Sequence, residues 1–417
     1  MMRDNYIDIN KIVNDKKVFK LFRAAESHGG ALRFVGGAVR DTLAGIRRDD
    51  LDIDLATDLS PEELVEACEE NGLKTIPIGI KFGTVGVVIG DKVLEVTSLR
   101  RDVCTDGRHA EVVFTTDWDA DASRRDLTIN AVYADEKGNV FDYYNGIEDL
   151  ENGKVRFIGV PGQRIREDYL RILRFFRFYS LFGKGDIDKK ALQACIDNRE
   201  GMKSLSIERI RDELGKILLT PNVVKTLKIM FENEILAHFL PESHNLENLQ
   251  FLIDLVDKYH IPYEPMRRLF ILYNPDEKLA ENLACRLRLS KKQRELFVRW
   301  SVYHPAIEEF YDDNSLRKLL YRFGRDFCFN KLLIEASMTL QEPQNFNEII
   351  HKTNTLEIPV FPLKGKHIIE AGIVNHHKIG EVLDKLEELW IESDFSLNFD
   401  ELTAQAQILV EAVDKAS

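Results

Sequence analysis

Hydrophobic and polar residues follow two different periods along this chain. From residue 31 to about residue 145, short apolar runs and alternating positions predict strands, with a helix among them. The stretches 83–89 and 93–99 are rich in β-branched residues and flank Gly90-Asp91, so we expect them to form a hairpin. From about residue 163 onward, apolar residues recur every three to four positions. The pattern therefore predicts an α+β N-terminal part followed by an all-helical C-terminal part.

Two segments carry clear helix boundaries. Ser60-Pro61-Glu62-Glu63 predicts a helix start, because it combines an N-cap serine, a proline at the first helical position and a capping-box glutamate. Residues 207–219 predict a helix that ends at Thr220-Pro221. Within it, Glu208-Arg209 and Glu213 occupy positions that an ordinary amphipathic core helix explains equally well.

A pair of glycines, Gly36 and Gly37, stands between the apolar run 31–35 and a helical stretch at 38–43. The glycines allow a tight turn, and a ligand phosphate could approach the backbone N–H groups at the helix start, where the peptide dipoles favour negative charge. Arg40, one turn further, could add a bidentate phosphate contact. A tight turn without a ligand is the alternative, and a Walker-type phosphate loop is excluded because no Gly-Lys-Ser/Thr follows.

Asp52 and Asp54 follow as two carboxylates separated by one residue. On a strand they point the same way, while Ile53 and Leu55 point into the opposite, apolar layer. Like charges on one face repel unless a cation lies between them, and Mg²⁺ prefers one or two carboxylates together with substrate phosphate oxygens. The alternative is a solvated acidic strand edge, which the neighbouring Asp49-Asp50 makes plausible.

Glu95 is the candidate for a third carboxylate. It lies between two apolar neighbours on the second strand of the expected hairpin, where an acid is unfavourable to bury without a partner. Three carboxylates on adjacent strands form a two-metal site, in which one cation activates an attacking hydroxyl and the other neutralises leaving pyrophosphate.

Residues 167–177 predict a helix with two distinct faces. One face carries the apolar stripe Leu170, Leu173 and Phe176. The other face carries charged residues that step by three: Asp168, Arg171, Arg174 and Arg177. A ladder of salt bridges on a solvated helix is the simplest interpretation of this spacing.

At this point the residues resemble those of a known family. The motifs are, in chain order, Gly36-Gly37-x-x-Arg40-Asp41, Asp52-x-Asp54, Glu95-Val96-Thr97, Arg124-Arg125-Asp126-Leu127-Thr128-Ile129-Asn130-Ala131 and Glu167-Asp168-x-x-Arg171. Together they resemble the class II CCA-adding enzymes, the tRNA nucleotidyltransferases, and the related bacterial poly(A) polymerases. The resemblance covers residues 31–220 and is loose beyond them. The stretches 105–112 and 164–174 are similar to the alphaproteobacterial and mitochondrial branch.

The resemblance implies a fold and a division of the chain. A polymerase β-like nucleotidyltransferase head with a mixed sheet would occupy residues 1–145. A helical neck for base recognition (146–220), a helical body (221–304) and a helical, tRNA-binding tail (305–417) would follow, in an elongated molecule. The motif containing Glu208-Arg209 would lie on the helix that backs the base-reading helix.

The resemblance also implies a site. Asp52 and Asp54 would hold Mg²⁺, and Glu95 would complete the catalytic carboxylates. The remaining positions would contact the nucleotide: Gly36, Gly37, Arg40, Arg125, Asp126, Asp168, Arg171, Arg174 and Arg177. For Asp126 the family match suggests the ribose, whereas its spacing from Asn130 suits a residue that braces a helix start.

Asp168 and Arg171 offer a physical basis for nucleotide choice. Cytosine and adenine share a ring nitrogen that accepts and an exocyclic amine that donates, and guanine and uracil reverse this pattern. A carboxylate and a guanidinium one helical turn apart fit CTP and ATP alike, and leave GTP and UTP with unpaired polar groups. The family implies the same role for both residues. The segment Gly107-Arg108-His109 is polar, and we expect it to form a mobile loop. The resemblance implies that this loop assists the switch from C to A addition.

Composition narrows the setting. The 417 residues suffice for two to four domains, and five scattered cysteines without metal-ligand spacing indicate reduced thiols in a cytoplasmic protein. No signal peptide or long apolar span is recognised, so no membrane partner is expected. The net charge of −13 argues against general RNA binding, but residues 155–225 carry 15 Lys and Arg against 9 Asp and Glu. Such a basic segment suits contacts with phosphates.

Three functions compete for this sequence. The leading one is template-independent addition of CMP, CMP and AMP to the 3′ end of tRNA from CTP and ATP, with release of pyrophosphate. The second is a poly(A) polymerase, against which stand the segments 81–85 and 105–111, which are similar to the CCA branch. The third is a non-catalytic RNA-binding relative, which we would expect to have lost a metal carboxylate. Whether the chain forms a homodimer is left open.

Overall fold

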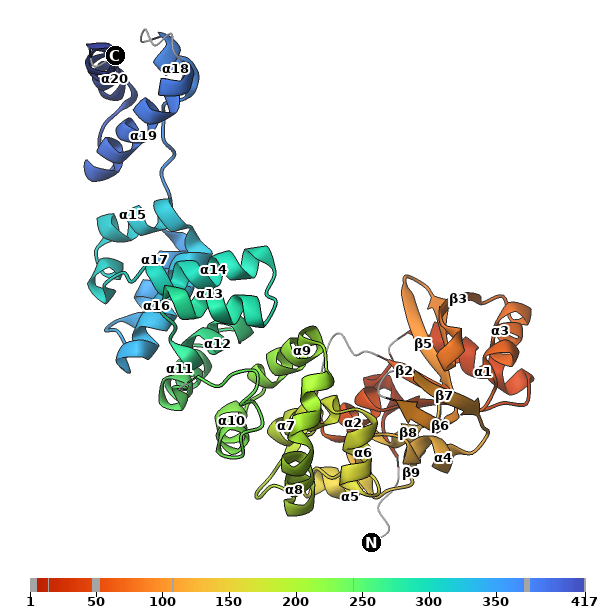
Figure 1. The fold of residues 1–417 in the computed structure, drawn as a ribbon. Coiled ribbons are helices and arrows are strands. Elements are labelled where there is room, and N and C mark those ends of the chain that lie inside the picture. Colours follow the sequence, from red (N-terminus) through yellow and green to blue (C-terminus); the bar gives the residue numbers. More distant parts are fainter. Residues whose placement is uncertain are drawn as a thin grey trace. The chain divides into compact units, whose positions relative to one another are not determined.

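The structure is a computed structural model that describes residues 6–13, 15–46, 53–106, 109–242, 244–370 and 376–415 (Figure 1). The chain separates into two compact units, residues 1–241 and residues 242–417. The predicted division at residues 145, 220 and 304 is finer than this separation and stays a prediction.

The first unit contains a mixed sheet of seven strands in the order β3-β4-β5-β2-β1-β8-β9. Its strands are β1 (Leu32–Val35), β2 (Asp54–Thr57), β3 (Lys74–Gly79), β4 (Thr84–Ile89), β5 (Lys92–Ser98), β8 (Val132–Ala134) and β9 (Val140–Asp142). Neighbouring strands run antiparallel, except β2 and β5, which are parallel. The hairpin expected around Gly90-Asp91 is formed by β4 and β5. The prediction of a mixed sheet is confirmed.

Helices α1 (Phe19–Ser27) and α3 (Pro61–Glu70) pack against each other and bury one face of the sheet (Figure 1). The core between them includes Leu21, Phe34, Leu55, Leu64 and Val96. The capping box at the start of α3 is present: the Glu63 N–H donates to Ser60 Oγ at 3.2 Å, and the Ser60 N–H donates to the Glu63 carboxylate at 2.8 Å. The residues that point away from this core therefore lie on the opposite face of the sheet.

The opposite face is partly covered by α4 (Trp118–Ser123) around a second apolar cluster. Its buried members are Val35, Ala56, Leu99, Ala122, Ala131, Tyr133 and Ile158. A separate hairpin of β6 (Arg100–Asp106) and β7 (His109–Phe114) follows the main sheet in sequence. The mobile loop predicted at 107–109 therefore includes one residue too many. His109 belongs to β7 and pairs with Asp106, so inter-strand hydrogen bonds satisfy its backbone. Gly107 and Arg108 lie outside the described residues.

The first unit continues with helices. They are α5 (Gly146–Glu151), α6 (Pro161–Glu167), α7 (Leu170–Phe182), α8 (Lys189–Asn198), α9 (Ile207–Leu218) and α10 (Val223–Glu232). The helix predicted over 167–177 is interrupted, because Asp168 is extended, with φ −156° and ψ 109°, and ends α6. Its backbone carbonyl accepts from the Arg171 N–H and its side chain from the Leu170 N–H, so α7 starts anew directly after it. Leu173 and Phe176 of the predicted apolar stripe are buried.

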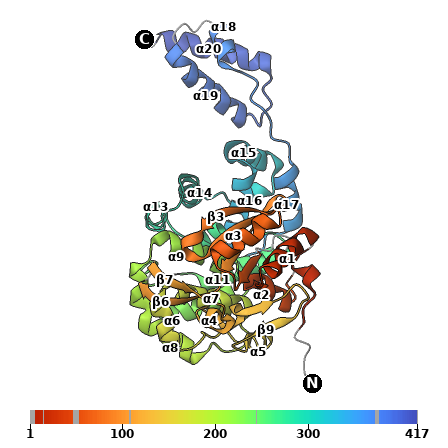
Figure 2. The ribbon, with the colours of Figure 1, turned by 90° about the vertical axis from the view of Figure 1, so that its right-hand side faces the viewer.

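The described part of the second unit is helical, as predicted. Its helices are α11 (Leu246–Lys258), α12 (Pro265–Tyr273), α13 (Glu277–Arg286), α14 (Lys291–Val302), α15 (Asp313–Phe323), α16 (Arg325–Thr339), α17 (Phe346–Thr355), α18 (Gly365–Glu370), α19 (His376–Glu392) and α20 (Phe399–Lys415). Figures 1 and 2 show α18, α19 and α20 lying together, and they share a small core around Leu386, Trp390 and Leu402. Among the described helices, none is long and apolar enough to cross a membrane.

Candidate active site

A row of paired residues crosses the face of the sheet that α1 and α3 leave open. Tyr133 on β8 pairs with Val35 on β1, Val35 pairs with Asp54 on β2, and Asp54 pairs with Glu95 on β5. Paired residues point to the same face, and neighbouring strands lie about 4.8 Å apart, so the two carboxylates are direct neighbours. Both side chains are exposed. Asp52, the other predicted metal ligand, lies outside the described residues.

The glycine pair forms the predicted turn between β1 and α2 (Gly37–Leu43). Gly36 has φ 68° and ψ −122°, a conformation that is strained for any residue with a Cβ atom. A Cβ atom at Gly36 would also lie 3.9 Å from Nη1 of Arg125. The turn thus brings the backbone of the glycine pair beside Arg125 of the motif Arg124-Arg125-Asp126.

A cavity of about 620 Å³ opens beside this turn. Every predicted nucleotide-contacting residue lines it, together with one predicted carboxylate. Its lining consists of Gly36, Gly37, Arg40, Asp54, Arg124, Arg125, Asp126, Asn130, Asp168, Leu170, Arg171, Arg174, Arg177, Phe178, Leu181 and Arg209. Among the lining residues, seven arginines stand against three aspartates, which gives the cavity wall an excess of positive charge. Such a concave, basic site suits a polyanionic ligand such as a triphosphate.

Arg40 is nearly buried, at 7% exposure. Its Nε and Nη2 donate to Asp41 Oδ1 at 2.9 and 2.7 Å, and its Nη1 donates to the Asn130 side-chain carbonyl. The guanidinium also lies over the rings of Phe178 and Phe182, at 4.8 and 4.9 Å from their centroids. These partners fix Arg40 firmly at the cavity wall, and its predicted phosphate contact stays a prediction.

Asp126 and Arg174 form an ion pair across two segments, with Arg174 Nε donating to Asp126 Oδ2 at 2.6 Å. Asp126 Oδ1 accepts from the Asn130 amide and from the Leu127 N–H. Burial alone would raise the pKa of Asp126, but attraction and hydrogen bonding by Arg174, assisted by Asn130 and Arg171, lower it to about 2. Asp126 therefore remains charged at neutral pH. The short 3₁₀ helix Thr128–Asn130 that follows has no side-chain cap. Asp126 therefore does not brace the start of a helix by capping it, which was the alternative to a contact with the ribose.

The four charged residues at 168–177 do not form the predicted salt-bridge ladder. Asp168 Oδ2 accepts from Arg209 Nη2 on α9 at 2.7 Å, and Arg171 pairs with Glu167 at 2.6 Å. The ladder was a wrong interpretation because the break at Asp168 turns this residue away from the regular spacing of α7. Arg171 also donates to the carbonyls of residues 164 and 124, so these contacts use three of its five N–H groups.

Arg177 is paired with Glu213 of α9, with 2.9 Å between Nε and Oε1. Burial, together with repulsion from Arg174 and Arg40, lowers the pKa of Arg177 from its ordinary value, and Glu213 opposes this shift. Its guanidinium lies 4.5 Å from the centroid of Phe178. The helix α9 therefore supports the cavity from behind through Arg209 and Glu213, beyond the ordinary core role that its pattern allowed.

Several lining residues were not predicted as contacts. Arg124 stands in the quoted motif directly before Arg125, so the motif itself was a signal for it. Phe178 and Leu181 follow Arg174 and Arg177 by four residues on α7 and so continue the arginine face, but as apolar residues they gave no signal for a nucleotide contact. Glu95 does not line the cavity and joins the site only through its pairing with Asp54.

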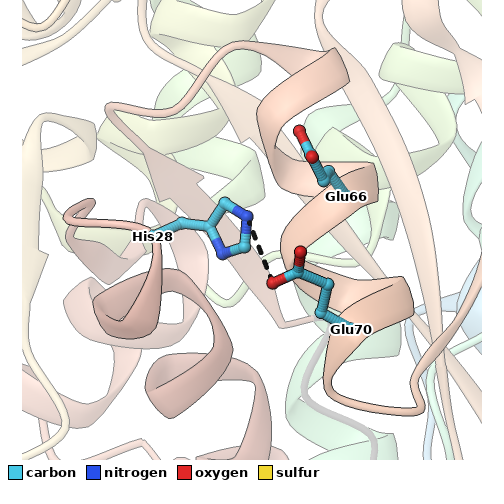
Figure 3. Close-up of side chains that lie close together, drawn as sticks. All are labelled: His28, Glu66 and Glu70. Carbon is cyan, nitrogen blue, oxygen red and sulfur yellow. Dashed lines mark ion pairs between the residues drawn. The ribbon is translucent and has the colours of Figure 1, made fainter.

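One further group of possible metal ligands lies on α1 and α3, on the other face of the sheet. His28, Glu66 and Glu70 bring their ligand atoms within 4.8 Å of one another (Figure 3). The Nε2 atom of His28 lies 3.6 Å from Glu70 Oε2, and Glu66 and Glu70 are exposed. An ion pair that joins the end of α1 to α3 accounts for this arrangement.

Family models described as "Poly A polymerase head domain" and "Probable RNA and SrmB- binding site of polymerase A" match residues 32–156 and 186–246. The chain is 36% identical to "CCA tRNA nucleotidyltransferase 1, mitochondrial" of Mus musculus, and the match covers 93% of this chain and 88% of that protein. The Homo sapiens protein of the same name gives the same identity and coverage. A crystal structure of the Bacillus stearothermophilus CCA-adding enzyme in complex with CTP is similar, with a TM-score of 0.76, 25% identity and coverage of 96% of this chain and 99% of that one.

Proposed function

The chain belongs to the CCA tRNA nucleotidyltransferase family, and we propose that it adds C, C and A to the 3′ end of tRNA from CTP and ATP in the cavity lined by Gly36, Asp54 and Arg174. The observation that carries the proposal is the position of the basic cavity, which includes Asp54 in its wall. The groups that can hold a triphosphate thus line the same cavity as Asp54, one of the predicted metal ligands.

The reaction is a nucleotidyl transfer. The 3′-hydroxyl of the tRNA forms a bond to the α-phosphorus of the nucleotide, the bond from that phosphorus to the bridging oxygen breaks, and pyrophosphate leaves. Arginines bind phosphates with planar, bidentate hydrogen bonds, so Arg124, Arg125 and Arg174 suit the triphosphate and the departing pyrophosphate. Holding the nucleotide in line with the hydroxyl supplies much of the rate enhancement in such transfers.

The carboxylates fit Mg²⁺. Asp54 and Glu95 are direct neighbours on parallel strands, both are exposed, and they offer the hard oxygen ligands that this ion prefers. Asp52 and Asp54 would hold the ion, with Glu95 beside them. When bound, Mg²⁺ lowers the pKa of the attacking 3′-hydroxyl and neutralises negative charge on the phosphates.

Base choice falls to Asp168 and Arg171 in this proposal. Asp168 is oriented by Arg209 and by the Leu170 N–H, and each carboxylate oxygen can accept a second hydrogen bond from an exocyclic amine. Arg171 is held by Glu167 and two carbonyls, and it retains N–H groups that can donate to a ring nitrogen. Two supported groups of opposite character can therefore select cytosine and adenine together.

The compartment of the proposed activity is the cytoplasm, in keeping with the reduced cysteines that the sequence predicts. The Mus musculus and Homo sapiens relatives carry the word mitochondrial in their names.

The experiment that tests the proposal offers each labelled nucleoside triphosphate, with Mg²⁺, to tRNA that ends at the discriminator base, after the first C and after CC, and to an unrelated oligo(A). We expect ordered addition of C, C and A, which then stops. Asp54→Ala should reduce incorporation by about a thousandfold or more and leave the tRNA dissociation constant within about twofold. Asp91→Ala, in the exposed β4–β5 turn, is the matched control. Long A tails on every primer, or an active Asp54→Ala variant, would contradict the proposal.

A further inference from the structure

Asp121 on α4 forms ion pairs with Arg124 and Arg125, two adjacent arginines that line the cavity. It is 1% exposed, and its Oδ1 accepts from Arg124 Nε at 2.8 Å and lies 2.6 Å from Arg124 Nη2. Its Oδ2 accepts from Arg125 Nη2 at 3.1 Å. Both arginines line the cavity, with side chains 17% and 19% exposed, whereas Asp121 does not line it.

Tyr133 closes this network from the sheet. Its hydroxyl donates to Asp121 Oδ2 at 2.8 Å and accepts from Arg125 Nε at 3.0 Å. The residue is fully buried, and its ring packs edge-on against Trp118 at 5.5 Å. Since Tyr133 stands in the same cross-sheet row as Asp54, two strands away, it fixes the arginine pair relative to the carboxylates.

The charges of the network are consistent with this role. Burial opposes ionisation of Asp121, but Arg125 and Arg124 hold its pKa below its ordinary value, so it is charged at neutral pH. Burial raises the pKa of Tyr133, so its hydroxyl keeps the proton that it donates. One buried negative charge thus offsets part of the repulsion between two neighbouring guanidinium groups.

We propose that Asp121 and Tyr133 are positioning residues that hold Arg124 and Arg125 in the geometry that binds the triphosphate, without touching the nucleotide themselves. A free arginine side chain loses rotamer entropy when it orders around a ligand, and a pre-ordered one loses less. The inference rests on the proposed function, because it takes the triphosphate as the ligand of these arginines.

A purely structural tie between α4 and the sheet is the competing explanation, and the chain offers a matched control for it. Asp149 is also 1% exposed, accepts from the Thr128 hydroxyl at 2.7 Å and pairs with Arg156 at 2.6 Å. Arg156 does not line the cavity. Asp149→Asn therefore removes an equally buried, arginine-paired carboxylate of the same unit without involving the nucleotide.

The test compares Asp121→Asn, Tyr133→Phe and Asp149→Asn in the full chain. Measured quantities are the dissociation constants of CTP and of tRNA, KM and kcat for CMP addition, and the melting temperature. We expect the CTP dissociation constant and KM to rise about tenfold in Asp121→Asn and about threefold in Tyr133→Phe, with tRNA affinity unchanged. Asp149→Asn should lower the melting temperature about as much as Asp121→Asn does, and it should leave CTP affinity unchanged.

A double-mutant cycle shows whether the effect passes through the arginines. In an Arg124→Ala/Arg125→Ala background, Asp121→Asn should change the CTP dissociation constant by less than about twofold. An undiminished effect there, or equal effects of Asp121→Asn and Asp149→Asn on CTP affinity, would overturn the inference. Failure of the proposed function is a separate result, namely no CMP addition by the unmodified chain and by Asp149→Asn.

Discussion

At the scale of single residues, Asp126 shows how a buried charge becomes tolerable at the cavity wall. Its carboxylate is 7% exposed and would lose most of its hydration on folding. Arg174, Asn130 and the Leu127 N–H replace the lost water with one ion pair and two hydrogen bonds. The charge therefore contributes to stability only while the carboxyl group is ionised.

This predicts a defined pH dependence for Asp126→Asn. The pKa of Asp126 is about 2 in the folded protein and 3.8 ordinarily, so its ionised form contributes stability above about pH 4, which is lost as the pH falls towards 2. The difference in unfolding free energy between the unmodified chain and Asp126→Asn should shrink by about 2 kcal/mol over this window, measured by urea unfolding. Asp91→Asn in the exposed turn is the control. A difference that stays constant from pH 5 to pH 2 would contradict the assignment.

The sequence revealed which residue types form the site, and it failed to reveal their partners. Asp54, Arg125, Asp126 and Arg174 stood in short motifs whose chemistry was readable. Two ion pairs that orient the site join segments 40 to 50 residues apart, namely Arg174 with Asp126 and Arg209 with Asp168. Local periodicity contains no information on such pairs, so the nearest sequence neighbours were wrongly taken as partners.

At the scale of elements, strand alternation was predictable and the break between α6 and α7 was not. Period-two patterning placed Asp54 opposite to Leu55, and the sheet confirms it, with Leu55 buried and Asp54 exposed. The sequence did not signal the break, because the apolar and charged positions of 167–177 fit one continuous helix equally well. Contacts from other segments hold the break in place: Arg209 binds Asp168, and the ring of Tyr169 packs closely against Gly201.

Gly201→Ala tests the importance of this break. A Cβ atom at Gly201 would lie 2.0 Å from Cε1 of Tyr169, the N-cap residue of α7, so the ring and the start of α7 must shift. We expect the CTP dissociation constant to rise about fivefold, since a small displacement of Asp168 and Arg171 misplaces both base-reading groups. Isothermal titration measures the change.

Gly215→Ala on α9 is the control for this substitution. A Cβ atom there would meet no atom within 4 Å, and alanine is favoured over glycine inside a helix by about 0.5–1 kcal/mol. This variant should melt at a slightly higher temperature and bind CTP normally. Equal CTP affinity of the two variants would show that the break at Asp168 does not govern nucleotide binding.

At the scale of the whole molecule, charge and chemistry are unevenly distributed. The chain carries a net charge of −13, yet seven arginines line one cavity in the unit formed by residues 1–241. Every described residue of the proposed catalytic and nucleotide site lies in that unit. The second unit is helical in its described part.

We expect one cavity to accept CTP and ATP through the same groups and to reject GTP and UTP. The most direct measurement is displacement of labelled CTP from the full chain, with Mg²⁺ and without tRNA, by each of the other three nucleotides. ATP should displace CTP completely, with an inhibition constant equal to its own dissociation constant, and GTP and UTP should need concentrations on the order of a hundredfold higher. Simultaneous binding of CTP and ATP, or equal displacement by all nucleotides, would show that the two substrates do not share one selective site.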